Sequence, residues 1–562
     1  MAPAAANGPG PGQRPTALSA MRYPIFRNVW LASSASHFGG MIQSVGAAWL
    51  MLSIAGSADM VALVQASVAL PVMLFSLVAG AMADNFDRRR MMLAAQLFML
   101  VVSVALAACA WLGFIRPWLL LLFTFLIGCG AAFNAPAWQA SVGDMVPRPE
   151  LPGAVAFNSM GFNFARSVGP AVGGAIVAAA GAAAAFAINA VSYVALVVVL
   201  ARWRPEWGPR LLPRESLRGA MGAGIRYVAM SPRLRSVLLR AAFFGLGASV
   251  VMALMPLVAS ELVDGGPMTY GLLLGSFGLG AIGGAAGSTR LRESTSSEAL
   301  VRLSCIAFAA GVGVAALSRV LPLTMFALMF CGASWVLALS TFNVTVQLST
   351  PRWVVARALS LYQMAAFGGM ALGSWLWGAI AERGDVGMAL FGAAAAMLAC
   401  AALGLWLPLA KLTDLNLDPL RPQLREPATA VPVQPRTGPV VVTIEYVIRE
   451  ADVLEFLGAM AERRRIRRRD GARNWRVLRD LADPEVWIER YESPTWLDYI
   501  RHNSRLTHDD AAVPEHLRAL HRGSGPPRVR RMIERQPSAL HTVPVSGPQV
   551  LTEPTSDQIR PS

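Results

Sequence analysis

Apolar runs, each about as long as a bilayer is thick, dominate the chain from residue 28 to residue 409. A membrane-spanning helix needs about 20 mostly apolar residues, and this region divides into twelve such runs. The runs cover residues 28–53, 60–83, 91–113, 117–138, 154–179, 182–201, 236–260, 268–289, 299–318, 321–346, 357–380 and 387–409. The pattern predicts an all-α membrane protein with twelve transmembrane helices in this part of the chain.

Two features divide the twelve runs into two groups of six. The longest connection, residues 202–235, follows the sixth run, and Pro-Arg pairs precede both the fifth and the eleventh run. Repeated six-helix halves around a central cavity are a transporter architecture. We therefore expect an N-terminal half at 22–201, a central loop at 202–235 and a C-terminal half at 236–410.

The pattern changes after residue 410, where a Pro-rich linker is predicted at 411–438. Beyond the linker, apolar and polar residues that alternate predict strands, and apolar residues that recur every three or four positions predict helices. The predicted order is strand, helix, strand, strand, helix, strand. The strands are expected at 440–448, 475–481, 486–491 and 529–535, and the helices at 451–468 and 495–520. This order indicates a small α+β ferredoxin-like domain at 439–536. Disordered tails are expected at 1–21 and 537–562.

Composition agrees with a membrane protein. The 562 residues are 55% apolar and 15% charged, whereas soluble domains carry about 25% charged residues. A soluble multidomain enzyme is therefore excluded as a description of the whole chain. The five cysteines lie in apolar runs without CxxC spacing, so we expect no disulfide framework, no metal site and no cofactor.

Arginine distribution predicts the orientation. If both termini are cytoplasmic, the inner loops carry sixteen arginines and the outer loops three, namely Arg116, Arg319 and Arg383. Loops that are rich in Lys and Arg remain on the cytoplasmic side. The sequence predicts a multi-pass protein of the bacterial cytoplasmic (inner) membrane with both termini inside.

The turn after the second run contains Gly80, Asp84, Asp87 and then Arg88-Arg89-Arg90. It resembles the loop signature of the major facilitator superfamily, G-x-x-x-D-x-x-G-R-[RK], with Asp87 where that family has Gly. The resemblance implies that Gly80, Asp84 and Arg88 form a contact that breaks and reforms during alternating access.

The fifth run contains Arg166-Ser-Val-Gly169-Pro170-Ala-Val-Gly173-Gly174. Proline removes a helix hydrogen bond, and glycines permit a bend or close helix contact. Ordinary small-residue packing would give the same pattern. The segment lies where proton-linked exporters of the superfamily carry their antiporter motif, and this position favours export.

Arg166 is the ionisable side chain that lies deepest inside a predicted span. Because an unpaired charge is costly there, it either lines a cavity or donates hydrogen bonds to carbonyl groups. If Arg166 lines a cavity, it favours an anionic or neutral, oxygen-rich substrate. Further candidates for substrate contacts are polar residues within the runs: His37, Gln43, Asn134, Asn158, Asn163, Tyr362 and Gln363. Each of them could equally form a hydrogen bond between helices.

The interiors of the predicted spans contain no Asp or Glu, and the fourth run lacks the arginine that the superfamily associates with proton coupling. A proton is the expected coupling ion only by resemblance. The opening Phe26-Arg27-Asn28-Val29-Trp30-Leu31, followed by Trp49-Leu50, resembles the transmembrane secretion effector family, the branch that includes the enterobactin exporter. The resemblance implies export of a siderophore-like metabolite or efflux of an antibiotic-like compound.

The C-terminal segment 440–536 resembles the dimeric α/β barrel of small monooxygenases by element order alone, which implies that it could self-associate. A membrane-tethered monooxygenase and a sensor fused to a transporter are therefore alternatives to an exporter without enzymatic activity. The arginine-rich run 463–469 is expected to be solvated or to face the membrane rather than to bind nucleic acid. Four histidines, His502, His508, His516 and His521, show no metal-ligand motif.

The predicted orientation is testable with topology reporters. An enzyme that is active only in the cytoplasm, fused after Leu409, should be active in cells, because an even number of spans returns the chain to its starting side. Activity of a periplasm-specific reporter at the same position would contradict the count of twelve spans.

Overall fold

The computed structural model describes residues 17–147, 150–204, 217–351, 353–409, 417, 427, 429–505 and 507–534. Within it the chain forms two compact bodies. The first comprises residues 1–208, 236–345 and 359–411, and the second comprises 209–235, 346–358 and 412–562. The predicted tail 537–562 and most of the predicted linker lie outside the described residues.

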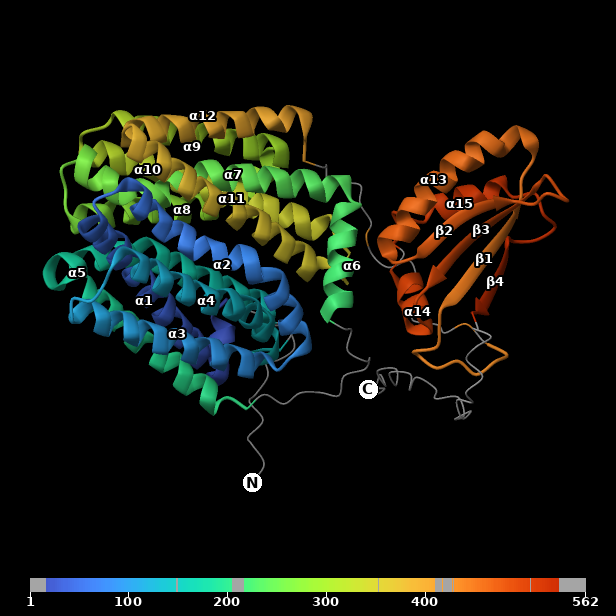
Figure 1. Cartoon of the computed structure of the whole chain (residues 1–562), viewed down its shortest axis with the longest axis horizontal. Helices are drawn as coiled ribbons and strands as arrows, with labels where there is room; N and C mark the ends of the chain where they lie inside the picture. The colour runs from blue at the N-terminus through green and yellow to red at the C-terminus, as the bar shows by residue number, and fades with distance from the viewer. Residues whose placement is uncertain are drawn as a thin grey trace, which may run out of the picture. The chain divides into compact units, whose positions relative to one another are not determined.

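The first body is a bundle of long helices (Figure 1). Its N-terminal half contains α1 (Pro24–Ala55), α2 (Ala58–Asn85), α3 (Arg88–Trp111), α4 (Pro117–Met145) and α5 (Leu151–Arg202). Its C-terminal half contains α7 (Pro232–Leu257), a π-helical turn η3 (Val258–Leu262), α8 (Pro267–Ser294), α9 (Ser297–Leu317), α10 (Leu321–Leu348), α11 (Val355–Arg383) and α12 (Val386–Trp406). Eleven of the described helices are long and apolar enough to cross a membrane.

Helix α5 accounts for the difference between eleven helices and twelve predicted spans. At 52 residues it would be about 78 Å long if straight, more than twice the hydrocarbon thickness of about 30 Å. Gly181 interrupts it with φ 77° and ψ 174°, a conformation that glycine adopts without steric cost. The two arms on either side of Gly181 correspond to the predicted fifth and sixth spans.

Helix starts follow local chemistry. Proline occupies the first turn of α1, α4 and α8, where its missing N–H is not needed. Asp87 precedes α3, and its carboxylate accepts a hydrogen bond from the Arg90 backbone N–H at 3.2 Å. Ser296 and Asp385 cap α9 and α12 in the same way.

The N-terminal boundary of the bundle differs from the prediction. Residues 17–21, expected to belong to a disordered tail, lie in a short 3-10 helix, η1 (Ala17–Arg22). Ala20 is fully buried in the same apolar cluster as Phe26 and Val29 of α1. Contact with this cluster accompanies the ordering of a segment that contains the helix formers Ala, Leu and Met.

The second body contains the α+β domain. Strands β1 (Val440–Val447), β2 (Arg473–Arg479), β3 (Val486–Ser493) and β4 (Arg528–Ile533) form an antiparallel sheet in the order β2-β3-β1-β4. This is the ferredoxin-like arrangement, as predicted. Helices α13 (Val453–Asp470), α14 (Trp496–Ser504) and α15 (Ala512–Leu520) pack on one face of it around Phe456, Tyr491 and Leu517.

The single helix predicted at 495–520 is two helices. Between them, the Asp510 carboxylate accepts hydrogen bonds from the Thr507 backbone N–H at 3.3 Å and from the Thr507 hydroxyl at 2.7 Å. A short polar side chain that bonds to nearby backbone competes with helix formation. This local turn ends α14 and lets α15 begin in a new direction.

The second body also takes in segments from outside the predicted domain. The central loop 202–235, predicted without a helix, contains α6 (Leu217–Ala229) and the start of α7. Residues 346–358, which join α10 to α11, belong to the same body. Part of the predicted linker is ordered as well, because the Trp496 and Leu497 backbone N–H groups donate to the carbonyls of Thr437 and Pro435.

The arginine-rich run in α13 is not wholly solvated, contrary to the prediction. Arg463 and Arg467 are buried and contact the Glu489 carboxylate on β3 at 2.7 and 3.3 Å. The Trp475 indole N–H also donates to Glu489, at 3.0 Å. Burial by itself would raise the pKa of Glu489, but the two guanidinium groups outweigh it and hold that pKa below its ordinary value.

We expect Glu489→Gln to lower the free energy of unfolding of this domain by about 3 kcal/mol, because it leaves two buried arginines without a counter-charge. Hydrogen exchange of α13 and β3 amides in the full chain measures the effect. Glu462→Gln is the matched control, since Glu462 is half exposed and its pair with Arg465 contributes little. Equal protection in both variants would contradict the prediction.

Candidate functional site

A cavity of about 610 Å³ lies inside the helical bundle. Most of its wall comes from α1, α2, α3, α4 and α5, and the C-terminal half contributes residues of α7, α8 and α11, among them Tyr270 and Gln363. The cavity is therefore shared by the two halves. None of the described residues that line it is Asp, Glu, Lys or Arg.

Five of the seven polar residues proposed from the sequence lie in this wall: His37, Gln43, Asn134, Asn158 and Gln363. They come from α1, α4, α5 and α11. The other two candidates, Asn163 and Tyr362, do not line it. The Tyr362 hydroxyl instead donates to the Leu339 carbonyl at 3.0 Å, which joins α11 to α10.

The polar groups of the wall differ in whether the protein already satisfies them. The Gln43 side-chain oxygen accepts hydrogen bonds from Asn189 and from Ser103, at 3.3 Å from the latter, and Asn158 accepts from Trp138 at 2.9 Å. By contrast, the side-chain oxygens of Asn134 and Gln96 are buried without a protein partner. A buried acceptor without a partner loses free energy, and both oxygens belong to residues of the cavity wall.

Gln96 was not among the residues proposed from the sequence. It lies in the third apolar run, and its side chain is 1% exposed. A lone amide in a span was a usable signal, because polar side chains in membrane helices face the bundle interior. The sequence could not show that its oxygen would have no protein partner.

Arg166 does not line the cavity, contrary to the expectation that it would be the cavity's positive centre. Its guanidinium carbon lies 5.4 Å from the ring centroid of Phe277 on α8 and 5.4 Å from that of Trp335 on α10. Aromatic faces attract a cation where water is excluded. Arg166 therefore joins the first half to the second, and a role in substrate charge selection is not supported by its position.

A second arginine, Arg240 of α7, is fully buried. It forms an ion pair with Glu298 at the start of α9, and Glu298 also accepts from the Leu409 backbone N–H at 2.9 Å. The pair ties α7 and α9 to the end of the last span. Sequence inspection missed it because Glu298 lies just before an apolar run and resembles a solvated helix start.

The loop signature positions its arginines against helix ends. Arg88 donates to the Asp144 carboxylate at 2.9 Å and to the Ala140 carbonyl at 3.0 Å, which joins α3 to α4. Arg89 donates to the Leu200 and Ala201 carbonyls at the C-terminal end of α5. Asp84 lies in the last turn of α2, and its side chain is outside the described residues.

Two glycine positions bring helices of opposite halves together. A Cβ atom on Gly80 of α2 would lie 2.7 Å from the Ser360 hydroxyl of α11. A Cβ atom on Gly174 of α5 would lie 2.6 Å from the Pro267 carbonyl and 3.0 Å from the Gly271 Cα of α8. The Pro170 carbonyl faces the same glycine of α8, whereas Gly169 and Gly173 contact α1.

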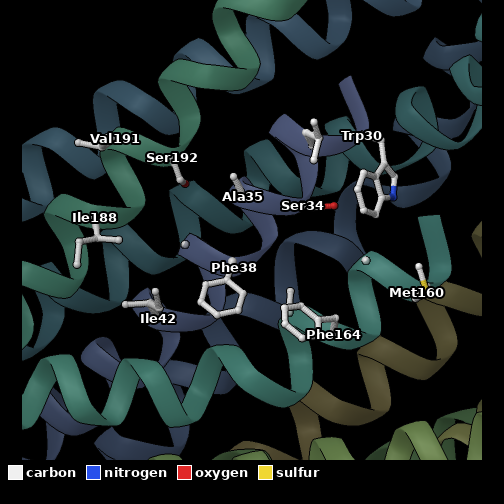
Figure 2. Close-up of a pocket in the computed structure, with 14 residues that line it drawn as sticks. Trp30, Ser34, Ala35, Phe38, Ile42, Met160, Phe164, Ile188, Val191 and Ser192 are labelled. Carbon is white, nitrogen blue, oxygen red and sulfur yellow. The ribbon is translucent and has the colours of Figure 1, made fainter. Parts of the chain in front are cut away.

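A second hollow, of about 650 Å³, lies on the outer side of α1 between the two arms of α5 (Figure 2). Its lining is almost wholly apolar and includes Leu31, Phe164 and Val191, each more than half exposed. An exposed apolar surface of a membrane helix is solvated by lipid chains. The internal cavity, with its polar groups, is therefore the candidate substrate site.

Comparison with known proteins agrees with this geometry. A family model described as transmembrane secretion effector matches residues 15–538. The chain belongs to the transmembrane secretion effector family. This confirms the resemblance inferred from the sequence, and the chain is a transporter of the major facilitator superfamily.

Relatives of this chain include a multidrug efflux pump and a siderophore exporter. It is 23% identical to the multidrug efflux pump Tap of Mycolicibacterium fortuitum, over 71% of this chain and 99% of the pump. It is 26% identical to the enterobactin exporter EntS of Shigella flexneri, over 54% of this chain and 72% of the exporter. Among solved structures, the POT family transporter PepTSo has the same fold, with a TM-score of 0.56 at 14% identity over 68% of this chain and 97% of PepTSo.

The contact between α5 and α8 predicts the effect of a larger side chain. Gly174→Val should lower the melting temperature of the purified protein in detergent, because overpacking a tight helix contact costs about 1–3 kcal/mol. Gly283→Val, which also lies in α8, is the control, since no atom lies within 4 Å of a Cβ atom added at Gly283. Equal melting temperatures for the two variants would refute the tight contact.

Proposed function

We propose that the protein exports a neutral, mostly apolar small molecule carrying a few hydrogen-bonding groups, such as an antibiotic-like compound or a secreted metabolite. Transport, without a catalytic step, is its activity in this proposal. The observation that carries it is the uncharged cavity with the two unpartnered amide oxygens of Asn134 and Gln96. The efflux activities named for its relatives support the direction.

The absence of charge among the described lining residues is the reason for a neutral substrate. An ion that leaves water for an uncharged, largely apolar cavity loses its hydration without gaining a counter-charge. Arg166, which could have supplied a positive centre, contacts Phe277 and Trp335 instead. A polyanionic siderophore is therefore a poorer fit to this cavity than a neutral compound.

Alternating access across the bacterial cytoplasmic membrane is the proposed mechanism. The cavity is shared by both halves, and α5 with α8 and α2 with α11 bring the halves together. Rocking of the halves at these contacts would open the cavity to one side at a time. If export is coupled to a proton, His37 is the described lining residue whose imidazole could take up and release it.

The test is export from bacteria that lack their own efflux pumps. Cells that express the protein are loaded with neutral, anionic and cationic compounds of similar size, and intracellular accumulation is measured. We expect the neutral compounds to accumulate least. Efficient export of the cations or anions, with none of the neutral compounds, would overturn the proposed substrate class.

Variants of the two free acceptors connect the substrate to the cavity. Asn134→Leu and Gln96→Leu should each reduce the export rate about fivefold to tenfold, because each removes a hydrogen bond of about 1 kcal/mol. Ser44→Ala is the control, since the hydroxyl of this lining residue already donates to the Met41 carbonyl at 2.7 Å. Unchanged export in both leucine variants would place the substrate elsewhere.

A further inference from the structure

The second body contains a stack in which two aromatic side chains lie between two arginine side chains. The Arg505 guanidinium lies 4.1 Å from the Trp353 ring centroid. The Trp353 and Tyr227 rings meet edge to face at 5.6 Å and 87°, and the Arg469 guanidinium lies 5.0 Å from the Tyr227 ring centroid. The four residues come from three parts of the sequence: α6, the segment between α10 and α11, and the α+β domain.

Both arginines of the stack are held in place by the α+β domain. Arg469, at the end of α13, pairs with the carboxylates of Asp470 at 2.9 Å and Asp510 at 2.7 Å. Arg505 donates to the Asp470 carbonyl at 3.0 Å. The domain therefore presents two oriented guanidinium groups, and the rings of Tyr227 and Trp353 contact them.

Polar contacts at the edge of the stack join the same partners. The Arg226 side chain of α6 donates to the Arg469 carbonyl at 3.3 Å. Arg233, in the first turn of α7, forms an ion pair with Asp509 at 3.7 Å. Burial agrees with a packed interface, because Tyr227 is 3% exposed and Arg469 is 7% exposed.

The segments that receive the domain are continuous with spans of the C-terminal half. Helix α6 ends at Ala229, and α7 begins at Pro232 after a hydrogen-bonded turn in which the Ser231 N–H donates to the Val228 carbonyl. Residues 346–358 connect α10 to α11. We propose that the α+β domain docks on its own chain through this stack, on α6 and the α10–α11 connection, and is not held by the linker alone.

This proposal goes beyond export and does not depend on the substrate. It identifies the docking partner as the chain's own α6 and the α10–α11 connection, whose aromatic rings fit oriented guanidinium groups. If a ligand bound to a domain attached in this way, the effect of binding would reach the connection between two spans. A domain held only by the linker would transmit nothing.

Cleavage of the linker in the full-length protein tests the docking. A protease recognition sequence is placed at 418–426, the intact protein is purified in detergent, the linker is cut, and the fragments are separated by size-exclusion chromatography. We expect the wild-type fragments to elute together. Separation of the wild-type fragments would overturn the proposal.

Single substitutions test the stack itself. Trp353→Ala removes two of its three ring contacts and should weaken retention of the C-terminal fragment by about tenfold, and Arg505→Ala should also release it. Trp353→Phe keeps an aromatic face and should retain the fragment, as should Arg464→Ala, which removes an exposed arginine of α13 outside the stack.

A folding defect is distinguished from undocking before the cut. The intact Trp353→Ala protein must elute as a single species with the wild-type melting temperature. If it does not, the test rests on Arg505→Ala, because this substitution changes only the α+β side of the contact. Full retention of the fragment in Arg505→Ala, or in the Trp353→Ala, Arg505→Ala double variant, would refute the role of the stack. None of these measurements involves transport, so failure of the proposed substrate class leaves them unaffected.

Discussion

Hydrocarbon offers a side chain no hydrogen-bond partner, and two arginines within the spans have partners from other helices. Arg166 lies over two aromatic rings, and Arg240 forms an ion pair with Glu298 that also holds the end of the last span. Each of the two arginines has a partner on another helix, although Arg240 Nε and Nη2 and one Glu298 carboxylate oxygen have no hydrogen-bond partner. The buried arginines therefore fix which helices are neighbours.

The same constraint shapes the cavity. Charged groups contact partners at helix interfaces, and amide, hydroxyl and imidazole groups remain for the wall between the two halves. A cavity of this kind binds by shape and a small number of hydrogen bonds. Since most of its lining is apolar, it suits molecules that partition out of water, and recognition depends on which acceptors the protein leaves free.

The α+β domain applies similar chemistry outside the spans. Glu489 is buried with Arg463 and Arg467, and Asp470 is buried with Arg469. These pairs orient guanidinium groups that would otherwise be mobile on a surface helix. Arg469 can then present its face to an aromatic ring, which a freely rotating side chain would do at a larger entropic cost.

The sequence by itself determined most elements of both bodies, with η1, α6 and the division of 495–520 into α14 and α15 as exceptions. Apolar runs of about 20 residues marked the spans because the length of such a helix is set by the bilayer, and alternation marked the strands because successive side chains of a strand point to opposite faces. The fifth and sixth spans were predicted as separate runs, 154–179 and 182–201, and Gly181 lies between them. The arginine-rich loops and the glycine positions of α2 and α5 carried the family resemblance, because such motifs consist of residues close together in the sequence.

The tertiary structure decided which polar groups face one another. Arg166 was predicted to lie well inside a span, but its partners Phe277 and Trp335 are more than 100 residues away, and no local pattern distinguishes them from other aromatic residues. In the same way, the arginines at 463–469 divide into buried and exposed members only once β3 supplies Glu489. Local periodicity depends on the nearest few residues, whereas burial, pairing and the free acceptors of the cavity depend on contacts between distant segments, which exist only in the folded chain.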